Sequence, residues 1–261
     1  MNIVVMHGSP RKGNTYQAAH FCLDEMKKLG DFSLKEFFLP NDMPAFCKGC
    51  FACILHSEQK CPHAHLMLPI VQAINAADGL IFTTPVYVMH ISAAMKSFLE
   101  HMAYNYMNHR PRLFTQKALV ITTTAGAGTK NVIRYMKENL SFWGINRVYA
   151  VGVKMLSIDW EGMKPSNRTK AMQAITQKAK LFYNDIASQK IHTPSMFQVM
   201  MFRVSQLLAL TYEADNADKM YWQEKGWLDK RCEFYLPNVR IHFFKRITGK
   251  LISKAFGLLI K

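Results

Sequence analysis

The stretch that decides the fold class is residues 1–29, which read MNIVVMHGSPRKGNTYQAAHFCLDEMKKL. The β-branched apolar run at residues 3–6 predicts a buried strand, and apolar residues recur at helical spacing over residues 14–29. The loop between them is short and rich in glycine, hydroxyl groups and cations. A strand, a polar loop and a helix in this order are typical of the first unit of an open α/β sheet.

The same alternation of short apolar runs and amphipathic stretches continues to about residue 188. Further strands are expected at residues 32–39, 79–83, 118–122 and 147–153, and further helices at residues 64–76, 92–102, 131–142 and 165–186. Five strands separated by helices indicate a parallel sheet that is covered on both faces. The expected architecture is therefore α/β, a flavodoxin-like, doubly wound, five-stranded parallel sheet.

The alternation stops in the last part of the chain, so we expect a domain at residues 1–188 and a helical, basic C-terminal extension at 189–261. The last 28 residues carry six Lys or Arg and no acidic residue. A helical wheel places an apolar stripe on one side (Phe244, Ile247, Leu251, Ala255 and Leu258) and cations on the other (Arg246, Lys250, Lys254 and Lys261). Such a helix packs on its own domain or on a second subunit, or it binds a membrane surface or a partner's groove.

Composition limits the function classes. The chain has 261 residues, 49% of them hydrophobic and 20% charged, which excludes a disordered or collagen-like protein. Its formal net charge of +15 favours anionic partners such as phosphorylated cofactors. No apolar run is long enough for a membrane span, and the N-terminus lacks the basic region of a signal peptide. We expect a cytoplasmic protein.

The loop after the first strand has the composition of a phosphate site. The candidate phosphate contacts are Ser9, Arg11, Lys12, Gly13, Asn14 and Thr15. Backbone N–H groups of the loop and the positive end of the following helix can face the same anion. The loop matches neither the dinucleotide-binding pattern nor the P-loop pattern, so a single phosphate monoester fits it better than a pyrophosphate or a triphosphate.

Residues 8–15, GSPRKGNT, resemble the phosphate-binding loop of the NAD(P)H-dependent FMN reductase family of flavodoxin-like flavoproteins. Residues 84–88, TPVYV, are similar to the family's second flavin loop, and residues 123–128, TTAGAG, follow the fourth strand, where the family has its third. The resemblance covers residues 1–188. It implies bound FMN with further contacts from Pro85, Val86, Tyr87, Val88, Thr123, Thr124, Ala125, Gly126 and Gly128. Backbone groups of residues 85–88 and 124–126 are expected to stabilise negative charge on the flavin ring.

A cysteine-rich insertion at residues 40–63 follows the second expected strand. Its cysteines, Cys47, Cys50, Cys53 and Cys61, are spaced so that successive thiolates can converge on one metal site. The pattern resembles the compact motif of the iron–sulfur flavoproteins, which carry a [4Fe–4S] cluster beside FMN, although the last gap is longer here. Two alternatives stay open: free thiols, or zinc with His56, His63 or His65 among its ligands.

The resemblance implies an FMN-dependent oxidoreductase that passes electrons from NADH or NADPH through the flavin to a small acceptor or a protein. No catalytic side chain is required, because the reactive atoms belong to the cofactor. The alternative is an iron–sulfur flavoprotein electron carrier without NAD(P)H activity. The resemblance also implies a homodimer or homotetramer, for which Trp222, Trp227 and Tyr235 are candidate contact residues. No nucleic-acid-binding motif is visible, so nucleic acid is not an expected partner.

Overall fold

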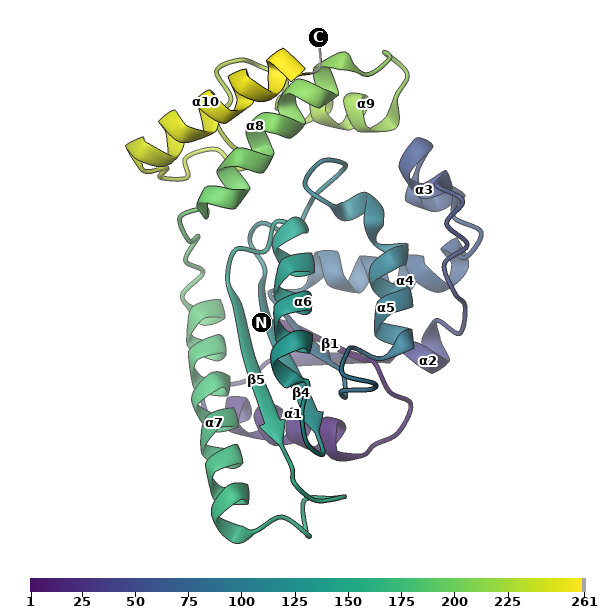
Figure 1. The fold of residues 1–261 in the computed structure, drawn as a ribbon, viewed down its shortest axis with the longest axis vertical. Helices are drawn as coiled ribbons and strands as arrows, with labels where there is room; N and C mark the ends of the chain where they lie inside the picture. The colour runs from purple at the N-terminus through teal and green to yellow at the C-terminus, as the bar shows by residue number, and fades with distance from the viewer. Residues whose placement is uncertain (260–261) are drawn as a thin grey trace.

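The computed structural model describes residues 1–259 and contains a five-stranded sheet (Figure 1). The strands are β1 (Asn2–His7), β2 (Ser33–Phe38), β3 (Gly79–Thr83), β4 (Lys117–Thr124) and β5 (Val148–Lys154). Their order across the sheet is β2-β1-β3-β4-β5, and all four neighbouring pairs are parallel. This is the flavodoxin-like order, so the predicted fold class is confirmed.

Helices cover both faces of the sheet because alternate strand residues point to opposite sides. Ile3 and Val5 face α1 (Asn14–Lys27) and α7 (Pro165–Ala187) in one hydrophobic core. Val4 and Met6 belong to the second core, on the opposite face. Three helices cover that face: α4 (Ala64–Ala76), α5 (Ala93–His101) and α6 (Thr129–Phe142). The predicted strands and helices of residues 1–188 are all present, with ends that differ by no more than two residues.

The strand register brings the carboxyl ends of the central strands to one edge. His7 of β1 lies opposite Thr83 of β3, and Thr83 lies opposite Ile121 of β4. The chain leaves β1 toward β2 on one side and returns to β3 on the other, so the direction of winding changes between β1 and β3. Ligands of open α/β sheets bind at such a switch point.

The insertion between β2 and α4 contains little regular structure. Its elements are short: α2 (Leu39–Asp42), α3 (Ala52–Leu55) and the 3₁₀ turn η1 (Glu58–Lys60). A second 3₁₀ turn, η2 (Ala103–Asn105), follows α5. Loops with so few backbone hydrogen bonds of their own need tertiary contacts to hold their cysteines in place.

The C-terminal extension is helical, as predicted, with α8 (Met196–Thr211), α9 (Ala217–Glu224) and α10 (Phe243–Leu259). A third core holds it together, and Met107 and Phe114 from the sheet-containing part contribute to that core. The ring of Phe114 stacks on Tyr235 with 4.6 Å between centroids. The extension therefore shares a hydrophobic core with residues 1–188.

The proposed role of three aromatic residues in subunit contact is wrong. Trp222, Trp227 and Tyr235 are buried in the third core of their own chain. The segment is small, and large aromatic side chains supply most of the apolar area that it can bury. They are consequently not available at the surface as anchors for a second subunit.

Of the alternatives for the last helix, burial of its apolar stripe in its own domain is contradicted by the structure. Phe244 is 80% exposed, Leu251 61% and Leu258 77%. Helix α10 contacts α8 through its opposite side, where Gly249 and Gly257 lie close to α8 side chains. Lys261, which the sequence places among the cations of this helix, lies outside the described residues.

Candidate functional site

The loop between β1 and α1 is held against the end of β3. The Gly8 N–H donates to the carbonyl of Thr83 at 2.7 Å. A Cβ atom at Gly8 would lie 2.7 Å from Ser92 Oγ and 3.1 Å from the Thr83 carbonyl oxygen. Only glycine permits so close an approach, and this contact fixes where the loop begins.

The N-terminus of α1 is open to an anion. Among the residues that the structure describes, no side chain caps this helix, and its first turn contains no acidic residue. Gly13 occupies the N-cap position without offering a side chain. The first N–H groups of a helix have no intrahelical partner and carry a partial positive charge, so a phosphate fits at this end.

A cavity of about 450 Å³ lies at this edge of the sheet. Its volume falls in the range of small-molecule sites. Eleven predicted flavin contacts line it: Ser9, Arg11, Gly13, Asn14, Thr15, Pro85, Val86, Tyr87, Thr123, Thr124 and Ala125. The structure therefore brings three loops, far apart in sequence, to one cavity.

Four other predicted residues, Lys12, Val88, Gly126 and Gly128, do not line the cavity. The ammonium group of Lys12 lies over the ring of Tyr16, 5.6 Å from its centroid. Val88 is 98% exposed. Gly128 has φ +99°, and a Cβ there would meet Val86 Cγ1 at 2.6 Å, so its role is to let the second loop pack on the third.

The two polar side chains at the start of α1 are used inside the protein. Thr15 Oγ1 lies 2.6 Å from Thr123 Oγ1, which joins the first loop to the third. The Asn14 amide donates to the carbonyl of Ile158 at 2.7 Å. Asn14 thus lines the cavity and also secures the loop after β5 through its amide.

Arg11 and Tyr87 join the first two loops. Arg11 Nη2 donates to the Tyr87 hydroxyl at 2.9 Å. Burial acts to raise the pKa of Tyr87, but hydrogen bonds from Arg11 and Ser9 outweigh it and lower the pKa below its usual value. A cationic group and a polarised phenol thus lie together at the wall of the cavity.

Three of the backbone N–H groups expected to face the flavin ring already have acceptors in the protein. The Val86 N–H donates to Thr123 O at 2.9 Å, and the Tyr87 N–H donates to His90 O at 2.9 Å. The Gly126 N–H donates to Thr124 Oγ1 at 3.3 Å. These three groups stabilise the loops themselves, so the assignment of residues 85–88 and 124–126 as ring donors is wrong at these positions.

The second loop is a strained hairpin. Tyr87 and His90 form an antiparallel bridge, and the two residues between them have positive φ, +47° at Val88 and +65° at Met89. A two-residue turn of this kind favours asparagine and glycine, whereas a β-branched residue is disfavoured there. The strain lies beside Tyr87, at the rim of the cavity.

Sequence reasoning missed three lining residues, Gln17, Ile158 and Asp159. The last two lie in the loop after β5, which Trp160 ties to the first loop by donating from Nε1 to Asn14 O at 3.2 Å. The Asp159 carboxylate accepts the Gly162 N–H at 2.7 Å. The sequence could have predicted this loop as part of the cavity, since it follows the fifth strand and therefore emerges at the same edge of the sheet.

A histidine–carboxylate network lies beneath the first loop. Glu36 Oε1 accepts from His7 Nε2 at 2.8 Å and from His20 Nε2 at 2.9 Å. Burial lowers the pKa of His7, which the neighbouring carboxylate only partly offsets. Burial acts to raise the pKa of Glu36, but the hydrogen bonds from the two imidazoles lower it overall. This network connects β1, β2 and α1.

The thiol of Cys53 lies near two other cysteines of the insertion. Burial raises the pKa of Cys53 to about 11, and the neighbouring thiols of Cys61 and Cys47 add to this effect. Cys50 is exposed, whereas the other three are partly buried. The Gly49 N–H lies 3.5 Å from Cys47 Sγ, as a donor to that sulfur. Thiols that are close together, with one backbone donor beside them, are suited to a shared metal or cluster.

A second ligand set overlaps with this one. Atoms of Cys61, His63 and His101 lie within 4.8 Å of one another. His101 is buried and its Nδ1 donates to the Ser97 carbonyl at 2.7 Å, which leaves Nε2 with a lone pair, 2.9 Å from His63 Nδ1. Such a carbonyl contact commonly orients a metal-binding imidazole. Neither His56 nor His65 joins this set within residues 1–259. His101 was missed because it lies on α5, outside the insertion.

The C-terminal extension supports the insertion through Arg110. Arg110 donates to the carbonyl oxygens of Cys53 and Ile54, the latter at 3.1 Å, and forms an ion pair with Asp218 of α9. Asp218 also accepts from His109 Nδ1 at 2.6 Å. The extension thereby positions the backbone on which Cys53 lies.

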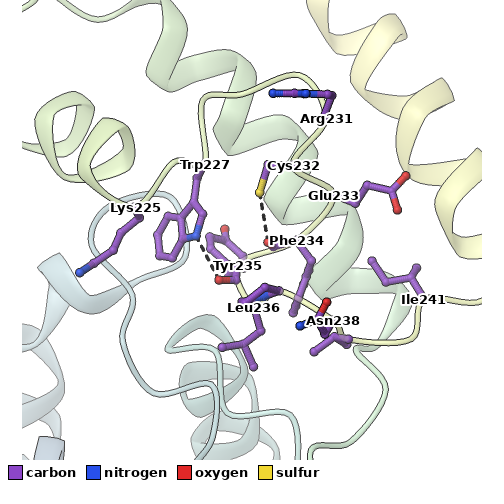
Figure 2. Close-up of a pocket in the computed structure, with 12 residues that line it drawn as sticks. Lys225, Trp227, Arg231, Cys232, Glu233, Phe234, Tyr235, Leu236, Asn238 and Ile241 are labelled. Carbon is purple, nitrogen blue, oxygen red and sulfur yellow. Dashed lines mark hydrogen bonds between the residues drawn. The ribbon is translucent and has the colours of Figure 1, made fainter.

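A larger cavity, of about 620 Å³, lies within the extension (Figure 2). Two of its polar groups bond within the lining itself: Trp227 Nε1 donates to Tyr235 O at 3.0 Å and Cys232 Sγ to Phe234 O at 3.3 Å. Its charged groups pair with residues outside the lining, as Glu233 does with Arg246. A binding site needs polar groups that converge on the empty space. The smaller cavity at the sheet edge meets this condition better, because an open helix N-terminus and Arg11 adjoin it.

Comparisons with known proteins agree with this geometry. An iron–sulfur flavoprotein of Archaeoglobus fulgidus is 27% identical over 235 residues, which cover 87% of this chain and 100% of that protein. An NADPH azoreductase of a Bacillus species is 26% identical over 143 residues, 54% of this chain and 69% of that protein. The solved FMN complex of a Bacillus anthracis NADH-azoreductase covers 70% of this chain and all of its own, with a TM-score of 0.56 and 15% identity, and supports the fold.

The family comparison covers the strands and loops that form the cavity. The model of the family described as NADPH-dependent FMN reductase matches residues 1–158, more than half of the chain. The matched region includes all three predicted flavin loops and the cysteine-rich insertion. The chain therefore belongs to the NADPH-dependent FMN reductase family.

Proposed function

We propose that this protein is an FMN-dependent oxidoreductase that accepts electrons from NADH or NADPH and passes them to a small acceptor or a redox protein. The observation that carries the proposal is the cavity at the β1–β3 switch point, where three loops and an uncapped helix N-terminus meet. Family membership supports the flavin, and the azoreductase relative supports a nicotinamide as electron donor.

When bound, FMN supplies the hydride-accepting chemistry, and the protein supplies its binding and orientation. The N-terminus of α1 and Ser9 hold the phosphate, because they present donors without a nearby carboxylate in the first turn. Thr15 positions the third loop through Thr123. The Arg11 guanidinium, fixed on the Tyr87 hydroxyl, places a positive charge at the rim of the cavity.

A visible spectrum of protein purified without oxygen, with FMN and iron assayed on the same sample, tests the cofactor. Addition of NADPH, and of NADH to a second sample, under the same conditions then tests the activity. We expect one FMN per chain and prompt loss of the flavin absorbance with at least one of the two donors. A protein that stays colourless after incubation with FMN would refute the flavin site, whereas bound FMN that neither NADH nor NADPH bleaches would refute the oxidoreductase and favour the carrier described below.

The phosphate position is tested by Ser9→Ala combined with Thr15→Ala. Loss of the Ser9 hydrogen bond to the charged phosphate costs about 1.5–3 kcal/mol, and loss of the Thr15 hydroxyl releases the third loop from the first, so FMN affinity should fall at least about tenfold. Thr15→Ser should restore part of it, and Thr169→Ala, which removes an exposed hydroxyl of α7, should have no effect. Retention of FMN by the double variant through purification would contradict the placement of the phosphate.

A second candidate function is that of an iron–sulfur flavoprotein carrier with a [4Fe–4S] cluster on Cys47, Cys50, Cys53 and Cys61. The effect of the Cys61 and Cys47 thiols on the pKa of Cys53 favours it, as does the iron–sulfur flavoprotein relative. The competing occupant is a single zinc ion on Cys61, His63 and His101, whose atoms already lie at single-ion spacing.

Metal analysis of anaerobic protein separates these occupants. About four irons per chain that are lost in Cys47→Ser but retained in His101→Ala would support the cluster. One zinc per chain that is lost in His101→Ala but retained in Cys47→Ser would support the single-ion site. Absence of both metals would indicate that the cysteines are free thiols and would support a simple NAD(P)H-dependent flavin reductase.

A further inference from the structure

Helix α10 presents an apolar face to solvent. Large side chains gather on it: Phe243, Phe244, Ile247, Leu251 and Leu258, each between 40% and 80% exposed. They recur at helical spacing, so they share one side of the helix. Figure 1 shows α10 alongside α8 at the end of the molecule remote from most of the sheet. Contiguous apolar surface of this kind marks an interaction site.

The packing of α10 on α8 explains why this face stays uncovered. Gly249 and Gly257 face α8, and the small residue Ser253 lies between them at four-residue spacing. A Cβ atom at Gly249 would lie 3.1 Å from Val199 Cγ1, and one at Gly257 would lie 3.6 Å from Leu207 Cδ1. Small residues allow the two helix backbones to approach closely, and the bulky residues are thereby directed away from α8.

The exposed face is bordered by cations. Helix α10 contains Lys245, Arg246, Lys250 and Lys254 and no acidic residue. Lys245 donates to Pro194 O at 2.7 Å, and Arg246 pairs with Glu233 at 2.9 Å. Lys250 and Lys254 are exposed and have no ion-pair partner in the part of the chain that the structure describes. Two free positive charges therefore lie beside the apolar residues.

We propose that α10 docks this face into the surface of a bilayer that contains anionic lipid. The apolar side chains enter the boundary between headgroups and acyl chains, and Lys250 and Lys254 contact the anionic headgroups. At 1.5 Å per residue the helix is about 26 Å long, and it lies in the membrane plane. None of the helices within residues 1–259 is long and apolar enough to cross a bilayer.

The charges favour a bilayer over the other possible occupants. Two copies of the chain that met through this face in a symmetric pair would bring the same lysines together, and like charges repel. A nucleic acid would satisfy the lysines but would leave Phe244, Leu251 and Leu258 exposed to water. An anionic bilayer satisfies both parts of the face at once.

Sedimentation with vesicles tests the proposal on the full-length, FMN-loaded protein. We expect binding to phosphatidylcholine vesicles with about 30% phosphatidylserine to be at least about tenfold stronger than binding to pure phosphatidylcholine vesicles, and to weaken with added salt. Phe244→Ser with Leu251→Ser should lower binding at least about tenfold, and so should Lys250→Glu with Lys254→Glu. All four side chains are exposed, so the fold should persist, which thermal unfolding checks.

Matched controls carry the same chemical changes elsewhere. Lys137→Glu with Lys170→Glu alters net charge equally on α6 and α7, and Leu181→Ser with Met220→Ser removes exposed apolar groups from α7 and α9. Equal effects of the α10 variants and their controls would overturn the proposal, as would failure to bind anionic vesicles. A dimer that Leu251→Ser dissociates would identify a second copy as the occupant, and displacement from vesicles by duplex DNA would identify nucleic acid.

Discussion

Replacement of Asp218 by asparagine removes the carboxylate through which the C-terminal extension contacts the cysteine-rich insertion. Asp218 pairs with Arg110 and accepts a hydrogen bond from His109 at 2.6 Å. The Asp218 side chain is only 4% exposed and that of Arg110 only 5%. Arg110 in turn donates to the backbone carbonyls of Cys53 and Ile54. The substitution therefore leaves a buried guanidinium with only the more distant Glu58 carboxylate, 4.0 Å from its Nε, as a counter-charge.

The expected loss follows from this burial. Removal of one partner of a buried ion pair costs about 3–5 kcal/mol, because the remaining charge stays desolvated. Arg110 keeps two carbonyl acceptors and asparagine keeps an amide oxygen, so we take the lower end, about 3 kcal/mol of the free energy of unfolding. For a protein of ordinary stability this is a large fraction of the total.

A second, local effect is expected at Cys53. Its pKa is raised to about 11 mainly by burial, so its thiol reacts slowly at neutral pH. Without a firmly held Arg110, the carbonyls of Cys53 and Ile54 lose part of their support and the thiol becomes more accessible. Its reaction with a thiol-specific disulfide reagent should accelerate in Asp218→Asn.

Urea denaturation and thiol labelling measure the two effects. The control is Asp229→Asn, which removes the carboxylate of an exposed ion pair with Arg231. We expect the control to match the unsubstituted protein in both assays, since exposed pairs contribute little. Equal stability of Asp218→Asn and Asp229→Asn, with equal Cys53 labelling rates, would refute the idea that the extension supports the insertion.

Three more predictions follow from the loops and the histidine network. Gly128→Ala should destabilise the fold by about 1–3 kcal/mol because φ is +99° and the added methyl group meets a valine, whereas Gly126→Ala, with no atom within 4 Å, should be neutral in the same denaturation assay. Val88→Gly should raise stability by about 1 kcal/mol by removing strain at φ +47°, and a loss of stability would contradict the strained turn. Acidification should destabilise the fold, because folding lowers the pKa of both His7 and Glu36. Protonation of His7 opposes folding once the pH falls below 6.5, the ordinary pKa of histidine. The stabilisation from ionised Glu36 is lost as the pH falls below 4.5, the ordinary pKa of glutamate. Unfolding measured between pH 8 and about pH 3 should show this decline. In Glu36→Gln the decline between pH 6.5 and 4.5 should be larger, because the carboxylate that raises the pKa of His7 is gone, and the decline below pH 4.5 should be smaller.

Local patterns in the sequence were sufficient for the α/β architecture. The buried parallel strands are continuous apolar runs, the helices carry one apolar face, and the loop composition between them is distinctive, so each element could be recognised by itself. The order of strands along the chain also fixed the edge at which ligand loops emerge. For this reason eleven of the predicted contacts line one cavity.

The apolar runs and the loop composition could not predict which acceptor each hydrogen-bond donor contacts. The Asn14 amide bonds to Ile158, and the N–H groups of Val86 and Tyr87 bond within the loops. Each of these choices depends on a partner that chain folding brings into reach. A residue type indicates what a group can donate, but it does not indicate which acceptor lies nearest.

The sequence by itself determined the sheet, the helices, the three loops and the amphipathic pattern of the last helix, because these depend on residues close together along the chain. Only the tertiary structure showed that His101 joins Cys61 and His63, that Asp218 holds Arg110, and that α10 turns its glycine face, not its apolar face, toward α8. Those contacts join residues that are far apart in sequence or depend on how two helices approach. They are decided by close packing, which selects the small residues for the interface and leaves the large ones exposed.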